Sequence, residues 1–255
     1  YSHRYWQKSA KSKRPKGAEQ IVLARADLGE YEKSLAEHGV IVDQEIRTML
    51  IRQQVEKITR DEGLGTSDES KALIDPALLQ EVTFLVENPQ SYGGKINAEF
   101  LRIPQDVLIT SMKKNQKYFP LLDRDGKLQA KFVVVTDGCD SPAVVEGNEK
   151  VLSARLSDAK FFFEEDQKTS LAQRQPELDK VGFFEKLGTL GDKALRLTKL
   201  AEWLGKRLKL SEQEIVAAQR VAQLCKVDLM TKMVYEFPEL QGVMGREYAL
   251  LSGET

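Results

Sequence analysis

The stretch that decides the fold class is YFPLLDRDGKLQAKFVVVT, residues 118–136. It holds two apolar runs, Tyr118–Leu122 and Phe132–Thr136, which are separated by the polar segment Asp123–Lys127. Asp125-Gly126 within that segment is typical of a tight turn between paired strands, because glycine adopts positive φ at no steric cost. The stretch therefore predicts a β-hairpin, and the helical patterns around it make the expected fold class α+β.

The segments on either side of the hairpin predict one more strand and two more helices. Ile96–Ile103 has the pattern of a strand, and Pro104-Gln105-Asp106 begins a short helix that ends near Met112. A long helix is predicted from about Asn148 to Asp166, because apolar residues recur there at helical spacing. We expect the aromatic run Phe161–Phe163 to lie in the core, with a base-stacking platform as the alternative. The apolar face of the long helix comprises Leu152, Leu156, Ala159 and Phe163.

Residues 27–88 are predicted to form a helical subdomain of three helices that pack together. The first contains Leu28, Tyr31 and Leu35 at helical spacing and ends at His38-Gly39. The second runs from about Asp43 to Glu62, and the third begins with Asp75 as its N-cap and Pro76 in its first turn. Asn88-Pro89 ends the third helix. The apolar positions of the second and third helices are Ile46, Leu50, Val55 and Ile58, and Leu78, Val82, Leu85 and Val86.

The C-terminal part, residues 176–255, is predicted to be helical, with a domain boundary near Pro176. From Leu190 onward the pattern is helical only, and Pro238 interrupts the last region. Asp192 and Lys193 near the start of the first of these helices are expected to form a local cap or an ion pair. The predicted apolar faces are Leu197, Leu200, Leu204 and Leu208 in one helix, and Ile215, Ala218, Ala222 and Cys225 in the next.

Composition places the chain among folded globular proteins. It has 255 residues, of which 41% are hydrophobic and 30% charged. The net charge of −1 means that any attraction to nucleic acid must come from a local patch. Cys139 and Cys225 form no CxxC pair, so we expect reduced thiols and a cytoplasmic location. We expect no membrane association, because no apolar run approaches the ~20 residues of a membrane span.

Motifs for metal binding and catalysis are missing from the sequence. His3 and His38 are the two histidines, and no CxxC pair, EF-hand loop, Walker loop, GxGxxG or GxSxG motif occurs. The acidic run Glu164–Asp166 is expected to be a solvated helix end. We therefore predict no catalytic residue and no metal site.

Four segments resemble the β subunit of bacterial two-subunit glycyl-tRNA synthetase, in its order and at its spacing. They are Lys113–Pro120, Gly147–Phe163, Leu187–Lys193 with Arg196, and Lys226–Ala249. The resemblance implies an internal part of a subunit that assembles with an α subunit into a heterotetramer of two α and two β subunits. It also implies that the α subunit activates glycine with ATP and Mg²⁺, while the β subunit binds tRNA(Gly).

The resemblance further implies two domains. Residues 1–175 are expected to form a mixed α/β domain similar to the B3/B4 domain of the phenylalanine enzyme's β subunit, with the helical subdomain at about 27–88. Residues 176–255 are expected to form an all-α HD-like domain. The expected function is that of a non-catalytic middle part without a cofactor of its own, which supports tRNA binding and assembly with the α subunit.

An HD-type phosphohydrolase, degenerate or active, is the alternative. Cys225-Lys226-Val227-Asp228 stands where an HD enzyme carries its His-Asp pair, and no histidine follows residue 38. A lysine ammonium has no free lone pair to replace an imidazole ligand, so Lys226 and Asp228 are candidates for an ion pair in the vacated pocket. An editing role is a third possibility, although glycine is the smallest amino acid and steric exclusion already rejects larger competitors.

The candidates for tRNA contact are basic residues near the hairpin and on the long helix. One group comprises Lys113, Lys114, Asn115 and Lys117, and the segment that holds them has no acidic residue, which suits contacts with phosphate. The alternative is a basic turn in which the Asn115 side chain caps neighbouring backbone groups. Lys150 and Arg155 are further candidates, although the basic residues of that helix span more than one face. Residues 1–18 are basic and contain aromatic side chains. They therefore either bind RNA through phosphate contacts and base stacking or form an ordinary solvated loop.

Overall fold

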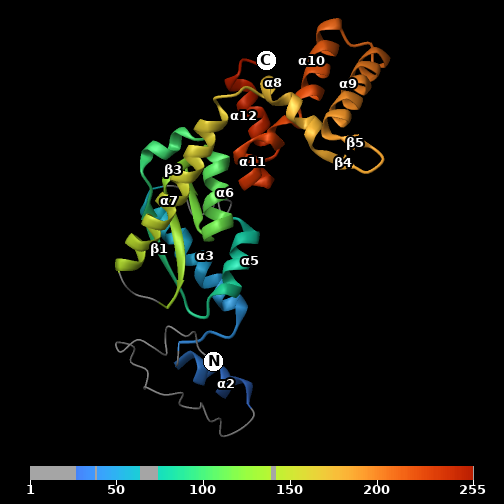
Figure 1. Ribbon diagram of the computed structural model, residues 1–255. Coiled ribbons are helices and arrows are strands. Elements are labelled where there is room, and N and C mark those ends of the chain that lie inside the picture. Colours follow the sequence, from blue (N-terminus) through green and yellow to red (C-terminus); the bar gives the residue numbers. More distant parts are fainter. Residues whose placement is uncertain (1–26, 38, 64–73, 139–141, 255) are drawn as a thin grey trace. The chain divides into compact units, whose positions relative to one another are not determined.

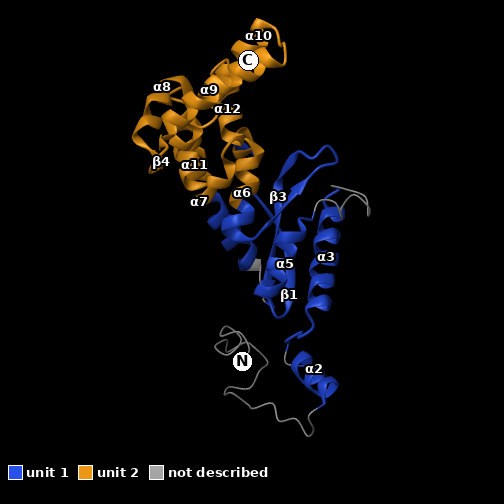
Figure 2. Ribbon diagram, turned by 90° about the vertical axis from the view of Figure 1, so that its right-hand side faces the viewer, with its two compact units in different colours: residues 1–99, 112–153 blue, residues 100–111, 154–255 orange. Residues whose placement is uncertain are grey.

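The computed structural model describes residues 27–37, 39–63, 74–138 and 142–254. These residues form two compact units (Figure 2). The first unit contains the described residues up to Glu99 together with Met112–Ser153, and the second contains Phe100–Ser111 together with the described residues from Ala154. The division lies between Ser153 and Ala154, whereas the sequence predicted a boundary near Pro176. Residues 1–26, and with them the predicted basic segment 1–18, lie outside the described residues.

The first unit is built around a three-stranded antiparallel sheet. Its strands are β1 (Pro89–Lys95), β2 (Phe119–Leu122) and β3 (Leu128–Asp137), in the order β1-β3-β2 (Figure 1). The predicted hairpin is confirmed, because β2 pairs with β3. Its turn is held by the Asp123 carboxylate, which accepts the N–H groups of Asp125 at 3.0 Å and Lys127 at 2.9 Å.

The predicted strand Ile96–Ile103 is wrong. The third strand is β1, which ends at Lys95, and residues 98–102 form the 3₁₀ helix η1 (Ala98–Arg102). The Asn97 side chain accepts the Glu99 N–H at 2.9 Å and so turns the chain away from the extended conformation. Strand β1 escaped prediction because it contains Gly93 and Gly94, which have low strand propensity.

Two helices cover one face of the sheet and share a core with it. They are α3 (Gln44–Asp61) and α5 (Pro76–Leu85), which begin at the predicted positions; Asp43 caps α3, and the predicted cap Asp75 caps α5. Helix α2 (Leu28–Glu37) buries none of its residues, so the expected packing of three helices holds only for α3 and α5. The shared core comprises Ile51, Val55, Ile74, Leu78, Leu79, Val82, Val86, Phe119, Leu121 and Val133.

The other face of the sheet meets the first half of helix α7 (Pro142–Asp166) (Figure 1). Phe132 alternates with Val133 along β3 and therefore points to this face, where the Tyr118 ring stacks on it with 4.8 Å between centroids. Helix α7 begins six residues before the predicted start at Asn148. Its predicted apolar positions Leu152, Leu156 and Ala159 are buried.

The second unit is helical, with one short hairpin. The hairpin of β4 (Gly182–Phe184) and β5 (Gly188–Thr189) contradicts the expectation that everything after residue 175 is helical. From Leu190 onward the described chain is helical, as predicted. Among the described helices, none is both long and apolar enough to cross a bilayer. The helices of this unit are α8 (Leu171–Arg174), η2 (Gln175–Lys180), α9 (Leu190–Arg207), α10 (Glu212–Leu224), η3 (Val227–Met230), α11 (Lys232–Glu236), η4 (Pro238–Leu240) and α12 (Val243–Leu251).

The predicted apolar face of α9 is largely wrong, and that of α10 is wrong at Cys225. Helix α9 buries Ala194, Thr198 and Gly205 instead of its leucines. A Cβ added at Gly205 would lie only 2.6 Å from Ile215 Cγ1, so the two helices approach too closely for larger side chains. In α10 the buried residues are Ala222 and Leu224, and Cys225 is exposed. On α9, exposed leucines are Leu195, Leu200 and Leu204.

Candidate functional site

The predicted basic turn is the C-terminal end of helix α6 (Gln105–Gln116), which extends four residues beyond the expected end at Met112. The Tyr118 N–H donates to the Met112 carbonyl at 3.0 Å, and Lys117 takes a positive φ of 58°. This hydrogen bond closes the helix in the manner of a Schellman motif, with lysine where glycine is usual. Lys114 and Asn115 lie exposed on the last turn.

Two of the three lysines form ion pairs with helix α5. The Lys113 ammonium pairs with the Asp75 carboxylate, and Lys117 Nζ lies 2.7 Å from Glu81 Oε1. Asp75 also caps α5, since its carboxylate accepts the Ala77 N–H at 2.9 Å. These lysines therefore join the end of α6 to α5, and their charges are partly neutralised within the first unit.

The Asp75 cap gives a testable acid dependence. The hydrogen bond from Lys113 holds the pKa of the Asp75 carboxyl below its usual value, against the opposing effect of burial. The carboxylate therefore stabilises the fold above the unfolded-state pKa of about 3.9, and this contribution is lost as the pH falls through the lower folded-state pKa. We expect Asp75→Ala to reduce the free energy of unfolding at neutral pH by about 1 kcal/mol.

Urea unfolding between pH 2 and 7 measures this prediction. Asp43→Ala is the matched control, because Asp43 caps α3 through the Glu45 N–H at 2.7 Å. Both variants should lose a cap, and we expect Asp75→Ala to flatten the fall in stability below about pH 4. If the free energy of unfolding falls equally below pH 4 in the wild type and in Asp75→Ala, the Lys113–Asp75 pair has no stabilising role.

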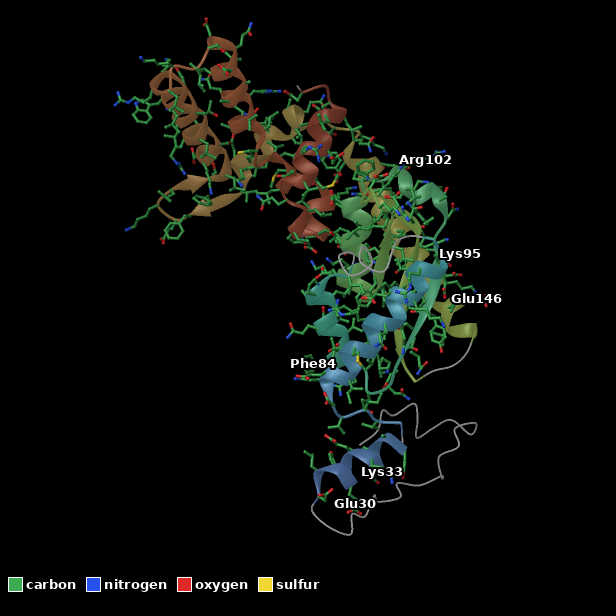
Figure 3. All side chains as sticks on the ribbon, turned by 180° about the vertical axis from the view of Figure 1, so that it is seen from behind. Glu30, Lys33, Phe84, Lys95, Arg102 and Glu146 are labelled. Carbon is green, nitrogen blue, oxygen red and sulfur yellow. The ribbon has the colours of Figure 1, made fainter. Side chains whose placement is uncertain are left out.

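The six predicted tRNA contacts do not all lie in one unit. Lys113, Lys114, Asn115, Lys117 and Lys150 belong to the first unit, whereas Arg155 belongs to the second. Lys150 Nζ lies 2.7 Å from Oε1 of Glu146, which is on the first turns of α7 (Figure 3). Arg155 follows five residues later, which places it about 140° around the helix from Lys150.

A cavity of about 250 Å³ lies in the first unit, and none of these six residues lines it. Thr48 and Arg52 of α3 and Leu79 and Phe84 of α5 are among its lining residues. The Phe84 side chain projects from α5 (Figure 3). Four of the candidates, Lys114, Asn115, Lys150 and Arg155, are exposed, and such surface suits contact with a macromolecule better than binding of a small molecule.

Two of the segments that carry the family resemblance meet at Tyr118 and Asn148. The Tyr118 hydroxyl donates to Asn148 Oδ1 at 2.5 Å, and Asn148 Nδ2 donates to the Val144 carbonyl at 2.7 Å. The neighbouring Glu149 accepts the Lys95 N–H at 2.8 Å, which attaches α7 to the end of β1. Burial raises the pKa of Tyr118 to about 12, so the hydroxyl stays a donor at physiological pH.

The expectation of a solvated acidic helix end is wrong for Asp166, which is only 2% exposed. One carboxylate oxygen accepts the Lys232 N–H at 3.0 Å, and the other accepts the Met233 N–H at 2.9 Å and the Tyr248 hydroxyl at 3.1 Å. The Arg174 guanidinium lies 3.5 Å from the first oxygen. The carboxylate thus joins the end of α7 to the start of α11 and to α12.

The aromatic run next to Asp166 is only partly in the core. Phe163 stacks on Tyr248 with 5.8 Å between ring centroids. Phe161 is 53% exposed, and Lys232 Nζ lies 5.4 Å from its ring centroid. The core prediction is therefore wrong for Phe161. Burial, with the neighbouring Asp166 carboxylate, raises the pKa of Tyr248 above its usual range, so its hydroxyl remains a donor.

Asp228 has no exposed surface, and its partners are backbone groups. Asp228 Oδ2 accepts the Gly242 N–H at 2.5 Å, while Oδ1 is buried without a partner among the described residues. Burial raises the pKa of this carboxyl, against the hydrogen bonds from Gly242 and Gly245. The predicted ion pair with Lys226 is not formed within the described part of the chain.

The local cap predicted near residue 192 is present. The Asp192 carboxylate accepts the Thr189 N–H at 2.8 Å, and the Thr189 hydroxyl accepts the Asp192 N–H at 3.1 Å. Lys193 lies over the Phe183 ring at 3.9 Å. In residues 27–37, 39–63, 74–138 and 142–254, no three His, Cys, Asp or Glu side chains converge on a point where a metal ion could bind.

Comparisons with known proteins agree with the four segments. The profile of the family described as glycyl-tRNA synthetase beta subunit matches residues 6–255. The glycine–tRNA ligase beta subunit of Syntrophomonas wolfei is 46% identical over 235 residues, which cover 91% of this chain and 33% of that protein. The subunit of Halothermothrix orenii is 48% identical over 217 residues, covering 84% and 31%. That of Bacillus subtilis is 42% identical over 226 residues, covering 88% and 32%.

This chain spans about a third of the length of the curated relatives it matches. The match nevertheless extends over almost the whole chain, including all four segments on which the resemblance was based. The chain therefore belongs to the glycyl-tRNA synthetase β subunit family.

Proposed function

We propose that this chain is a non-catalytic part of a glycine–tRNA ligase β subunit, which supports tRNA(Gly) binding and assembly with the α subunit. In this proposal the α subunit uses ATP and Mg²⁺ to activate glycine, within a heterotetramer of two α and two β subunits. The observation that carries the proposal is the family match over residues 6–255. The B3/B4-like and HD-like identities of the two parts belong to the same proposal.

The buried carboxylates support the non-catalytic part of the proposal. Asp166 receives two backbone N–H groups and the Tyr248 hydroxyl, and Asp228 receives the Gly242 N–H. Both are enclosed by the fold, so neither is placed to reach a substrate. The phosphohydrolase alternative requires Asp228 to bind a metal ion. A stoichiometric metal found by elemental analysis of the purified protein would favour that alternative.

Exposed cations of the first unit support the tRNA-binding part. Lys114 and Lys150 are exposed, and the Glu146 partner of Lys150 is an exposed residue of the same helix, whereas Lys113 and Lys117 are half-buried and bind the carboxylates of α5. Contacts of lysine with phosphate fix the position of a nucleic acid without reading its sequence. We therefore assign the phosphate contacts to Lys114, Asn115 and Lys150, and the stabilisation of α5 to Lys113 and Lys117.

Lys114→Ala with Lys150→Ala in the full-length protein tests this assignment. We expect tRNA affinity to fall roughly 10- to 30-fold at 0.15 M salt, because two phosphate contacts no longer release counterions. The slope of log K against log salt should flatten by about 0.7–0.9 per lost contact, measured by fluorescence anisotropy of labelled tRNA.

The matched control is Lys33→Ala with Lys168→Ala, which removes two other exposed lysines. It should leave the slope unchanged. An unchanged slope in the Lys114 and Lys150 variant as well would assign those two lysines to the turn structure or to the subunit interface.

A further inference from the structure

Helix α9 has two sides of different character. Its buried side contains Ala194, Thr198 and Gly205, and Gly205 packs against Ile215 of α10. At 100° per residue, Trp203 lies about 180° around the helix from Ala194. The exposed residues on this opposite side are Arg196, Lys199, Leu200, Trp203 and Arg207.

Trp203 is the central residue of this exposed side. Its indole is 61% exposed, although tryptophan is highly buried on average. Lys199 and Arg207 stand one helical turn before and after it, about 6 Å along the axis, and Arg196 stands one turn further. Lys199 and Arg207 form no ion pair with any described residue, whereas Lys206 is paired with Glu202 at 2.5 Å.

The segment is also strongly basic for a chain with a net charge of −1. Residues 190–209 contain six lysines and arginines and two carboxylates, Asp192 and Glu202, which leaves a net charge of +4 (6 − 2). Both carboxylates are engaged, Asp192 in the helix cap and Glu202 with Lys206. The outward side therefore presents unneutralised positive charge on both sides of an aromatic ring.

We propose that this side of α9 binds an unpaired segment of RNA, with Trp203 stacked on a base and Arg196, Lys199 and Arg207 in contact with phosphates. The proposal rests on the proposed function, which makes tRNA(Gly) the RNA that the protein meets. Stacking on a side chain requires a base that is free of its neighbours, which loops and single-stranded ends provide and a duplex does not. Positive charge on both sides of an exposed ring is complementary to phosphates on both sides of a stacked base, which favours RNA as the partner.

Two variants of the full-length protein separate the roles of the ring and of the charges. Trp203→Ala should weaken tRNA binding about 5- to 150-fold with little change in salt slope, because stacking is not a charge contact. Trp203→Phe should restore most of that affinity. Arg196→Gln with Lys199→Gln and Arg207→Gln should flatten the slope by roughly 2, at about 0.7 per contact with a single strand.

The controls use residues of the same kinds elsewhere. Tyr235→Ala removes an aromatic side chain that is 87% exposed on α11, and Lys33→Gln with Lys57→Gln and Arg60→Gln removes three exposed cations. Both should bind tRNA as the wild type does. Circular dichroism should show unchanged folding in every variant, since all these positions are exposed.

Fluorescence gives a direct readout of Trp203. The difference in emission between the full-length protein and its Trp203→Phe variant isolates the signal of Trp203. We expect a short single-stranded RNA to quench its emission and a duplex of the same sequence to leave it unchanged.

The outcomes separate this inference from the proposed function. If the wild type does not bind tRNA, the proposed function fails and this inference with it. If the wild type binds but the α9 variants bind equally well, the inference alone is overturned. It is also overturned if the variants change subunit association in sedimentation while tRNA affinity stays constant, because the surface would then be a protein interface.

Discussion

Replacing Asp166 by alanine is expected to destabilise the helical unit by about 3–5 kcal/mol. The change leaves two buried backbone N–H groups, of Lys232 and Met233, and the Tyr248 hydroxyl without their acceptor. It also removes the carboxylate that faces the mostly buried Arg174 guanidinium, which keeps its hydrogen bonds to backbone carbonyls such as those of Thr169 and Met230. Losing one member of a buried hydrogen-bonded charge pair is among the most costly single substitutions.

Asparagine at the two buried aspartates provides a matched comparison. Both oxygens of Asp166 accept hydrogen bonds, so the amide of Asp166→Asn would point N–H groups at N–H or O–H donors, and we expect most of the alanine effect. Asp228 Oδ1 has no donor among the described residues, so Asp228→Asn can place its amide nitrogen there. It also removes a charge that burial disfavours, as the raised pKa of this carboxyl shows.

Urea unfolding followed by circular dichroism measures both substitutions. We expect Asp228→Asn to cost less than half as much as Asp166→Asn. Equal losses, or a loss below about 1 kcal/mol for Asp166→Ala, would contradict the role assigned to the Asp166 carboxylate.

Gly94→Ala should destabilise the sheet unit by about 1–3 kcal/mol or more. A Cβ at this position would lie 2.5 Å from Cζ of Phe132, and that ring is fully buried against Tyr118. The ring has no free space to move into, so the substitution has to displace a strand. Gly93→Ala is the control on the same strand, because its Cβ would meet only a side-chain methyl group of Ile58 at 3.3 Å.

A double variant shows whether the ring contact causes the loss. Phe132→Leu alone leaves a cavity, but in combination with Gly94→Ala it removes the clash. The double variant should therefore lose less free energy of unfolding than the sum of the losses in the two single variants. Thermal unfolding of the four proteins gives the coupling. Additive losses would assign the Gly94 effect to the strand backbone instead of the ring.

The sequence predicted the parts of the fold that depend on neighbouring residues. The hairpin followed from Asp125-Gly126 between two apolar runs, and the starts of α3 and α5 followed from Asp43 and Asp75. These signals are local, because a turn dipeptide or a cap acts on backbone groups within a few residues.

Features that depend on distant contacts were missed. Strand β1 contains Gly94 because the Phe132 ring occupies the space of a side chain, and Phe132 is 38 positions away in the sequence. Helix α9 buries small residues because α10 approaches closely, so its leucines are exposed against expectation. Packing between elements decided both outcomes, and hydrophobic periodicity does not contain that information.

The candidate site was predicted in part. Family resemblance selected the segments, and the structure shows that several of their polar residues hold the fold together, as Asn148 and Asp166 do. The one available signal for Asp166 was its position next to the aromatic run Phe161–Phe163. The partners of Lys113 and Lys117 were not predictable, because Asp75 and Glu81 reach them only through the packing of α5.

The most direct test of the proposed function compares two steps of the reaction in the full-length protein assembled with an α subunit. Glycine-dependent pyrophosphate exchange reports activation of glycine without tRNA, and glycine transfer to tRNA(Gly) reports the complete reaction. For Lys114→Ala with Lys150→Ala we predict an unchanged exchange rate and a KM for tRNA raised roughly 10- to 30-fold. A fall in exchange that matches the fall in charging would contradict the account, because these residues would then contribute to the activation of glycine.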